Sequence, residues 1–291
     1  MINALTIDVE DYFQVNAFAN HIRRDQWDTY PLRVDGNTRR ILDLLDNFSI
    51  TATFFVLGWV AERLPGLTKE IHRRGHEIAC HGYGHELIYS IGPDRFRADI
   101  RRAKTILEDQ CGERVNGYRA PSYSITGKSL WALEILVEEG FTYDSSIFPV
   151  IHDTYGIPAA ERFPHRLQTG AGPLIEFPLT TVPLHFFYKE VRLPIAGGGY
   201  LRLFPAELLA WGIKRINSQE QQPAVLYFNP WEIDPDQPRI KASLKSRFRH
   251  YLNLIKTEGK LKHLFGELEF GTMMSVLDNN VPNQVHETSP L

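Results

Sequence analysis

HEIACHGYGH, residues 76–85, is the stretch that decides the fold of this chain, because a short apolar run leads directly into two histidines. The first five residues have a strand-like pattern, and His81 and His85 follow at a spacing of four. On a helix, that spacing would place both imidazoles on one face. Gly82 and Gly84 disfavour a helix, since each costs about 1 kcal/mol there relative to alanine. We therefore expect both histidines in the loop that follows a strand.

Strand-like runs and amphipathic segments alternate about seven times along the chain. Strands are predicted at 4–9, 51–58, 76–80, 115–121, 141–146, 174–182 and 224–231, and helices at 37–48, 67–75, 92–112, 128–140, 205–216 and roughly 240–263. This alternation is typical of a parallel βα barrel or a doubly wound sheet. No Gly-x-Gly-x-x-Gly follows the first strand, which disfavours a nucleotide-binding fold.

The chain is expected to form one main domain over residues 1–275. The segment 147–204 is rich in proline and poor in helical periodicity, so it is predicted to be an inserted lobe or a set of long loops. A polar C-terminal tail is predicted at 276–291. Cys80 and Cys111 do not suggest a disulfide framework.

Composition narrows the class of protein. The net charge is −3 and the pI is about 6.4, so the basic excess of a nucleic-acid-binding protein is missing. No run reaches the roughly 18 apolar residues that a membrane span requires. The N-terminal sequence has no features of a signal peptide, and a cytoplasmic location is the resulting expectation.

Polar side chains follow most of the predicted strands. They are Asp8, Glu10 and Asp11 after the first, His81 and His85 after the third, Arg119 after the fourth, Asp144 to Ser146 after the fifth, and Asn229 and Glu232 after the last. In a parallel βα barrel the carboxyl ends of all strands lie on one face, where active sites form. These residues are therefore expected to converge in one cleft.

The residue types that converge there point to metal chemistry. Two histidines and a carboxylate can bind a divalent cation on one side and leave positions open for water and substrate. A second carboxylate can act as base, and an arginine beside it can orient it. The set is suited to metal-assisted hydrolysis of an acyl bond.

Together these segments resemble the polysaccharide deacetylases, also called NodB-homology domains or carbohydrate esterases of family four. The motifs that carry the resemblance are DVEDYF (8–13), HGYGHE (81–86), YRAPSYSI (118–125), YDSSIFP (143–149) and NPWEIDP (229–235). They look closest to the branch found with bacterial exopolysaccharide export clusters. The resemblance covers residues 1 to about 275. It implies a distorted (β/α)7 barrel that removes acetyl groups from sugars with a divalent metal, zinc first, with cobalt, nickel or manganese as alternatives.

The resemblance also implies roles for individual residues. Asp8 matches the base, His81 and His85 match metal ligands, Arg119 matches the arginine that pairs with the base, and Asp144 matches an acid that supports this network. The third metal ligand is open: the spacing from Asp8 favours Glu10, because alternate residues of a strand share a face, but a bend could deliver Asp11. A backbone N–H near Ser122 or Tyr123 is expected to complete the oxyanion site.

The chain departs from the family pattern at Asn229. A histidine is expected there as general acid, and an asparagine side chain cannot deliver a proton at neutral pH. Three explanations stay open: an engineered substitution, another proton donor such as water or protonated Asp8, or a weak or inactive relative that still binds sugar. A second departure is Gly82, where many relatives have Ser or Thr, and which is expected to loosen the loop.

The leading hypothesis is a metal-dependent N-deacetylase whose partner is an N-acetylated carbohydrate. The alternatives are an amidohydrolase for a cyclic imide or ureide, and a sugar-binding relative without turnover. Aromatic side chains, above all Trp231 and Tyr123 and also Tyr83 and Tyr200, are candidates for stacking on sugar rings. The remaining histidines are expected to be structural or superficial: His21, His72, His76, His152, His165, His185, His250 and His263.

Overall fold

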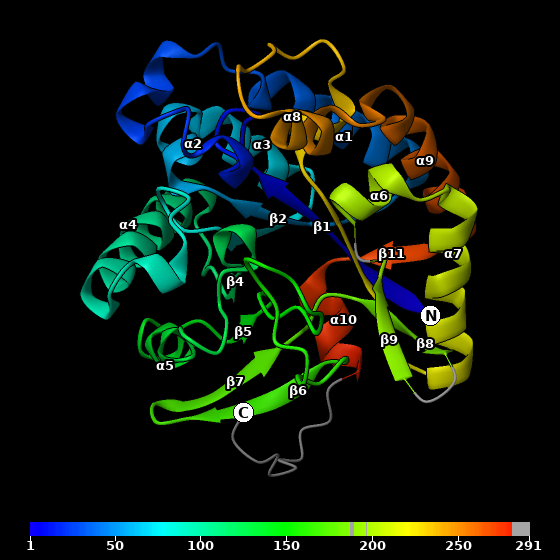
Figure 1. Cartoon of the computed structure of the whole chain (residues 1–291). Helices are drawn as coiled ribbons and strands as arrows, with labels where there is room; N and C mark the ends of the chain where they lie inside the picture. The colour runs from blue at the N-terminus through cyan, green and yellow to red at the C-terminus, as the bar shows by residue number, and fades with distance from the viewer. Residues whose placement is uncertain (187–188, 196, 281–291) are drawn as a thin grey trace.

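The computed structural model describes residues 1–186, 189–195 and 197–280. A sheet of mainly parallel strands occupies the middle of the molecule, with helices around it (Figure 1). Seven parallel strands follow one another in the order β10-β1-β2-β3-β4-β5-β7 in this part of the chain. Their bounds are β1 Ile2–Val9, β2 Thr53–Val56, β3 Glu77–Cys80, β4 Gly117–Tyr118, β5 Tyr143–Asp144, β7 Gly172–Glu176 and β10 Val225–Phe228. The predicted distorted (β/α)7 barrel is confirmed.

Helices occur at all six predicted segments. The helices are α1 Val34–Phe48, α2 Gly58–Arg63, α3 Pro65–Arg73, α4 Pro93–Cys111, α5 Trp131–Glu138, α6 Gly199–Leu203, α7 Ala206–Arg215, α8 Leu244–Tyr251, α9 Leu254–Glu267 and α10 Met273–Asn280. Three of them, α2, α6 and α10, were not predicted. α4 shows the predicted end signals, with proline in its first turn and Gly112 as a left-handed C-cap. The helical stretch expected at 240–263 is two helices, because the backbone leaves the helical region at Leu252 and Asn253.

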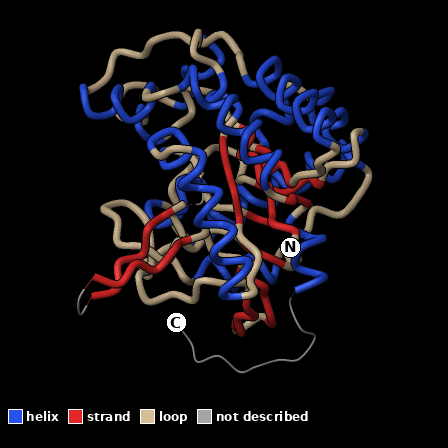
Figure 2. The backbone as a smooth tube through the Cα atoms, turned by 90° about the vertical axis from the view of Figure 1, so that its right-hand side faces the viewer, coloured by secondary structure: helices blue, strands red, loops and turns tan. Residues whose placement is uncertain are grey.

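The segment predicted as loops, 147–204, contains regular structure. β6 (His165–Thr169) pairs antiparallel with β7, and β8 (Thr181–Phe186) forms a hairpin with β9 (Lys189–Pro194). The hairpin projects from the body of the molecule (Figure 2). The single strand expected at 174–182 is two strands, β7 and β8, because the chain leaves the sheet between them. The one-domain boundary itself stays a prediction.

The gap between β7 and β10 is bridged by a side chain. Thr180 Oγ1 accepts a hydrogen bond from the Val225 N–H at 2.6 Å and donates one to the Val225 carbonyl at 3.0 Å. Gly197 forms an isolated bridge with Tyr227, where a Cβ would lie 1.7 Å from the Tyr227 carbonyl oxygen. The glycine-rich AGGG run therefore allows the chain to pass against β10.

The C-terminal segment begins with structure, in contrast to the predicted tail. β11 (Glu269–Gly271) pairs with β1, and α10 continues to Asn280 because Val276 and Leu277 are buried. The expected tail is thus wrong for 276–280, and its remainder, 281–291, lies outside the described residues. No helix in the described ranges is long and apolar enough to span a bilayer.

Candidate metal and hydrolytic site

A cavity of about 220 Å³ lies at the carboxyl ends of the strands. Its lining includes nine of the residues that the sequence singled out: Asp8, Glu10, His81, His85, Ser122, Tyr123, Asn229, Trp231 and Glu232. Asp11, Arg119 and Asp144 do not line it. Below, the strand wall means Asp8, Glu10, His81, His85 and Tyr123, and the helix wall means Arg202, Asn229, Trp231, Glu232 and His250.

Glu10, His81 and His85 form a compact group of ligand atoms on the strand wall. One ligand atom from each lies within 4.8 Å of the others, and all three side chains are buried. Among the described residues this is the group that could hold a metal ion. A larger groove of about 700 Å³ along α7 and α9 contributes no such group.

The chemistry of this group fits a divalent cation. His81 Nδ1 lies 2.8 Å from the Arg119 carbonyl oxygen, to which it can only donate, so the Nε2 electron pair is left for a ligand. Burial lowers the pKa of His81, which favours the neutral, ligating form. Glu10 Oε2 is buried and accepts no aligned hydrogen bond from the described residues, although His85 Nε2 lies 2.7 Å away. A cation shared between these two atoms would resolve that contact.

Asp8 lies beside this group and is held by Arg119. The fully buried guanidinium donates to Asp8 Oδ1 at 2.8 Å and to Thr6 Oγ1 at 2.7 Å, and its other contacts are the Ser145 carbonyl and hydroxyl oxygens. The Tyr123 hydroxyl donates to Asp8 Oδ2 at 3.3 Å. Both carboxylate oxygens are therefore fixed in orientation.

Asp11, the alternative to Glu10, has a different task. Its carboxylate accepts hydrogen bonds from the backbone N–H groups of Arg33 at 2.8 Å and Val34 at 3.0 Å, at the start of α1. It thus satisfies donors that the first turn of a helix leaves free. Burial raises the pKa of Asp11 to about 6 in spite of these bonds. The structure brings Glu10, and not Asp11, to the histidines.

Asp144 does not line the cavity, and its support of the arginine or histidine network stays a prediction. Its carboxylate accepts a hydrogen bond from the Ser146 hydroxyl at 2.6 Å, and that hydroxyl accepts one from the Ala120 N–H, next to Arg119. Asp144 is in register with Tyr118 and with Glu176, and Tyr118 packs against α4 through Phe96. Because side chains alternate along a strand, Asp144 faces the helices while its neighbour Ser145 reaches Arg119. Burial raises the pKa of Asp144 to about 6 and that of Glu176 well above its usual value, since two carboxyl groups lie together there.

The turn after β4 has unusual backbone angles. Ser122 and Tyr123 are both left-handed, with φ of 51° and 54°, a conformation that is costly for residues other than glycine. The Tyr123 N–H donates to the Ala120 carbonyl at 3.0 Å. Of the two expected oxyanion donors, this leaves the Ser122 N–H.

The His81–His85 loop is well anchored, in contrast to the loosening expected from Gly82. Asp99 accepts hydrogen bonds from the N–H groups of Tyr83 and Gly84, and Arg24 donates to the carbonyls of Gly84 and His85. Gly82 has φ +72°, and a Cβ there would lie 2.8 Å from Asp99 Oδ2. Glycine is therefore what allows Asp99 to hold the loop.

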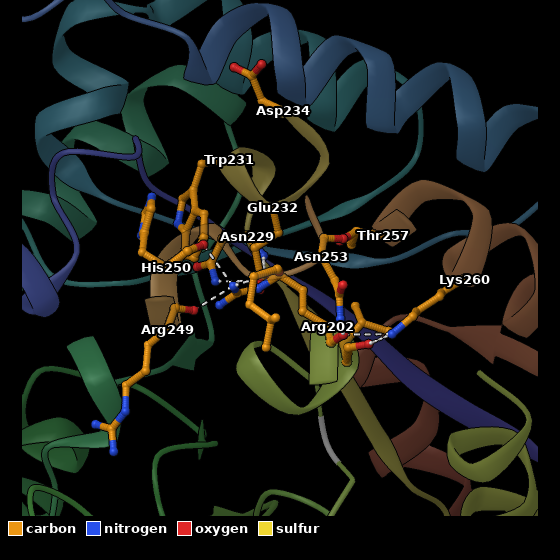
Figure 3. Close-up of polar contacts among 12 residues, drawn as sticks. Arg202, Asn229, Trp231, Glu232, Asp234, Arg249, His250, Asn253, Thr257 and Lys260 are labelled. Atoms are coloured by element: carbon orange, nitrogen blue, oxygen red, sulfur yellow. Dashed lines mark hydrogen bonds and ion pairs between the residues drawn. The ribbon is translucent and has the colours of Figure 1, made fainter. Parts of the chain in front are cut away.

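On the helix wall, Asn229 belongs to a buried network (Figure 3). Glu232 Oε2 accepts hydrogen bonds from the Asn229 backbone N–H at 2.9 Å and from its amide group at 3.1 Å, while Arg202 Nε donates to Glu232 Oε1 at 2.6 Å. Arg202 Nη1 donates to the carbonyls of Arg249 and His250, at the end of α8. The network fixes residue 229 against both α6 and α8.

Trp231 is placed to orient Glu10, a candidate metal ligand, and its ring is not free to stack on a sugar. Its indole N–H donates to Glu10 Oε1 at 3.3 Å, and its ring stacks on His250 with 4.1 Å between centroids. The Arg202 guanidinium lies 5.1 Å from the ring centroid. Tyr83 and Tyr200, the other proposed stacking residues, do not line the cavity.

His250 is a cavity residue that sequence reasoning left among the structural histidines. Its Nε2 lies 2.6 Å from Gln237 Oε1, and the Gln237 amide nitrogen donates to two carbonyls, so Nε2 carries the proton. Burial, followed by the charges of Arg202 and Arg239, holds the pKa of His250 well below its usual value. The imidazole is therefore neutral, and its Nδ1 is an acceptor to which no described residue donates.

No motif around residue 250 could have shown this. His250 lies in a helix with the sequence LKSRFRHY, which contains no spacing typical of a metal or catalytic site. No sequence pattern indicates a role for Arg202 either, because its hydrogen-bond partners lie 30 and 48 residues away in the chain.

The fold and this ligand group define a βα-barrel protein with a metal-type site. Residues 26–140 match the polysaccharide deacetylase family, and residues 145–278 match a domain of unknown function, DUF3473. The predicted resemblance to the polysaccharide deacetylases is thereby confirmed over residues 26–140. The exopolysaccharide branch stays a prediction.

Named relatives agree with this assignment. A peptidoglycan-N-acetylglucosamine deacetylase of Bacillus cereus is 36% identical over 98 residues, which are 33% of this chain and 36% of that protein. A chitooligosaccharide deacetylase of Azorhizobium caulinodans is 28% identical over 100 residues, 34% of this chain and 45% of that protein. The chain spans about a third of the length of the first of these relatives.

One solved structure is similar over nearly the whole chain. It is a candidate polysaccharide deacetylase from Mycobacterium smegmatis, with a TM-score of 0.60 and 22% identity, and the alignment covers 99% of this chain and 94% of that one. At this identity the likeness establishes the fold.

Proposed function

We propose that this protein is a metal-dependent deacetylase that hydrolyses the N-acetyl group of a sugar in a polysaccharide or its precursor. The observation that carries the proposal is the buried Glu10–His81–His85 group beside a carboxylate, Asp8, that an arginine holds in place. The names of the relatives, which specify peptidoglycan N-acetylglucosamine and chitooligosaccharides, support an N-acetylated sugar as the substrate class.

Glu10, His81 and His85 would hold the metal, and two nitrogens with one oxygen suit zinc. When bound, a divalent cation supplies Lewis acidity toward water and toward a carbonyl oxygen. Asp8 is placed to accept the proton of the attacking water, because Arg119 and Tyr123 fix both of its oxygens. The Ser122 N–H is the backbone donor for the oxygen that becomes negative.

The leaving amine also needs a proton, and residue 229 cannot supply it. The Asn229 amide donates to Glu232 instead. His250 does not replace it. Its Nε2–H is donated to the Gln237 side-chain oxygen, and burial keeps the imidazole neutral. We therefore assign the proton return to Asp8, which has gained a proton in the first step.

The test is acetate release from N-acetylhexosamine oligomers, with zinc content measured on the same sample. Acetate release that disappears with a chelator and returns with zinc is the expected result. An Asn229→His variant restores a titratable donor, and an increase of roughly 10²- to 10⁴-fold is expected where this proton transfer limits the rate. Parallel assays on cyclic imides separate the amidohydrolase alternative.

Asn229 also favours one second candidate, a sugar-binding relative without turnover. Its amide, which donates to Glu232, puts a fixed group that cannot transfer a proton at the position where the family has its acid. Binding of N-acetylhexosamine oligomers without acetate release, in both the parent chain and Asn229→His, would establish this second function. The cytoplasmic location expected from the N-terminal sequence stays a prediction.

A further inference from the structure

Three large apolar side chains are exposed on one rim of the cavity. Ile151, in the loop before β6, is 90% exposed, and Leu244 and Phe248 of α8 are 81% and 66% exposed. Leu244 and Phe248 are four residues apart in the helix, so they share a face. We call these residues, with the cations of α8, the α8 rim.

The positive charges of the α8 rim are not balanced by nearby acidic residues in the sequence. No acidic residue occurs from 237 to 257, whereas that stretch contains six exposed cations: Arg239, Lys241, Lys245, Arg247, Arg249 and Lys256. Within the described ranges none of the six forms an ion pair. On α4, by contrast, Arg97, Arg101 and Arg102 are all paired with glutamates. Three of the six, Lys245, Arg247 and Arg249, belong to α8 and therefore to the rim.

The rim adjoins the mouth of the cavity. Arg249 and His250 line the cavity, and Phe248 precedes them on the exposed side of the same helix. The loop at Ile151 lies beside α8: burial lowers the pKa of His152, and the charges of Arg249 and Lys245 add to that effect. Asp153 brings one negative charge to the loop side. In Figure 3 the Arg249 side chain extends away from the buried network.

We propose that the α8 rim docks on the surface of an anionic lipid bilayer, with the cavity mouth beside the membrane. Aliphatic and aromatic side chains between basic residues are the composition of helices that lie in a bilayer interface. The cations attract anionic headgroups, while the stems of lysine and arginine cover apolar surface. A glycan offers hydroxyl groups but no acyl region, so Leu244 and Ile151 would gain little from it.

The proposal extends the proposed function, because a deacetylase docked in this way would act on glycan presented at a membrane surface. Docking itself needs neither metal nor turnover. It can therefore be measured on the full chain without substrate, and its failure is distinguishable from failure of the deacetylase assignment.

The experiment is flotation of the full chain with vesicles of phosphatidylcholine that contain 30 mol% phosphatidylglycerol, a composition chosen for the test. Binding to these vesicles, and at least about tenfold less to pure phosphatidylcholine, is expected. Leu244→Ser with Phe248→Ser should lower the partition coefficient about tenfold or more, since two apolar side chains leave the interface. Lys245→Gln with Arg247→Gln should lower it by a similar factor and make it less sensitive to salt.

The matched control is Trp211→Ser with Lys214→Gln on α7, which removes an exposed aromatic and a cation elsewhere. It should bind vesicles like the parent. Equal binding to neutral and anionic vesicles, no binding, or unchanged binding of the Leu244 and Phe248 variant would overturn the proposal. Retention on an immobilised acidic polysaccharide without vesicle binding would reassign the rim to an anionic glycan.

Discussion

The two walls of the cavity differ in how many of their polar atoms have hydrogen-bond partners within the protein. On the strand wall, Glu10 Oε2 and His81 Nε2 keep electron pairs to which no described residue donates in aligned geometry. On the helix wall, Glu232 accepts hydrogen bonds at both oxygens, and the Asn229 amide is used within the wall. The strand wall therefore has electron pairs available for a cation, whereas Glu232 and the Asn229 amide hold the helix wall in one conformation. The predictions below test this contrast.

The largest effect is expected at Asp8. Asp8→Asn should lower kcat/KM by roughly 10²- to 10⁴-fold, because the base is lost, while zinc content stays unchanged. Acetate release and metal analysis on the same sample measure both. The control is Asp11→Asn, which should keep activity, because the asparagine oxygen can still accept hydrogen bonds from the Arg33 and Val34 N–H groups. Equal loss of activity in both variants would contradict the separate roles.

The next effect concerns an acid outside both walls. The pKa of Asp144 rises from 3.8 to about 6 on folding, chiefly through burial. Above about pH 6 this group is ionised in the folded and unfolded states, and the native state bears the full cost. Below about pH 4 it is protonated in both, and the cost vanishes. Asp144→Asn should therefore stabilise the protein at pH 7 and hardly at all at pH 3.5.

Denaturant unfolding at both pH values measures this difference. Asp153→Asn, at an exposed site, is the matched control and should change stability little at either pH. A stabilisation by Asp144→Asn that is the same at pH 3.5 and pH 7 would show that titration of Asp144 is not its cause.

A smaller effect is expected where the helix wall reaches the strand wall. Trp231→Phe removes the N–H that orients Glu10, and outer partners of this kind contribute roughly 10- to 100-fold to metal affinity. Zinc affinity by competition with a chelator is the measurement. Trp131→Phe, on α5, should leave it unchanged. An unaltered zinc affinity in Trp231→Phe would mean that the two walls are independent.

The smallest effect belongs to His250. If its Nδ1 accepts a hydrogen bond from the sugar, His250→Gln should raise KM about fivefold with kcat unchanged, because one hydrogen bond of about 1 kcal/mol is lost. His250→Asn can place an oxygen near the Nδ1 position and should retain more affinity. A purely structural role predicts that both variants lose stability without this split between KM and kcat.

The sequence predicted the strand wall and, in the helix wall, the residues that follow β10, but it missed Arg202 and His250 for a physical reason. Asp8, Glu10, His81 and His85 follow strands, and parallel strands bring their carboxyl ends together whatever their separation in the chain. Arg202 and His250 come from helices whose placement depends on packing. Asp144 shows the limit of the strand rule: a strand end sets the position of a residue, but the alternation of side chains decides which face it reaches.

In the 147–204 region, predicted as an inserted lobe or long loops with one strand at 174–182, the strands β6 and β9 were missed. β7 joins β5 in the sheet, through the register of Tyr143 with Ile175 and of Asp144 with Glu176. Pairing partners more than 30 residues apart compensate for weak local propensity. The helices were predicted well, since their signal lies within a single turn or two.

The hydrogen bond from Trp231 to Glu10 has a consequence for assembly of the molecule. It joins residues that are 221 positions apart, one just after the first strand and one just after the last strand of the barrel. An ion bound as proposed would favour the conformation in which this bond exists, and by reciprocity completion of the barrel would tighten the ion. The ion would then bind more tightly to a complete barrel than to one whose C-terminal half has not yet docked.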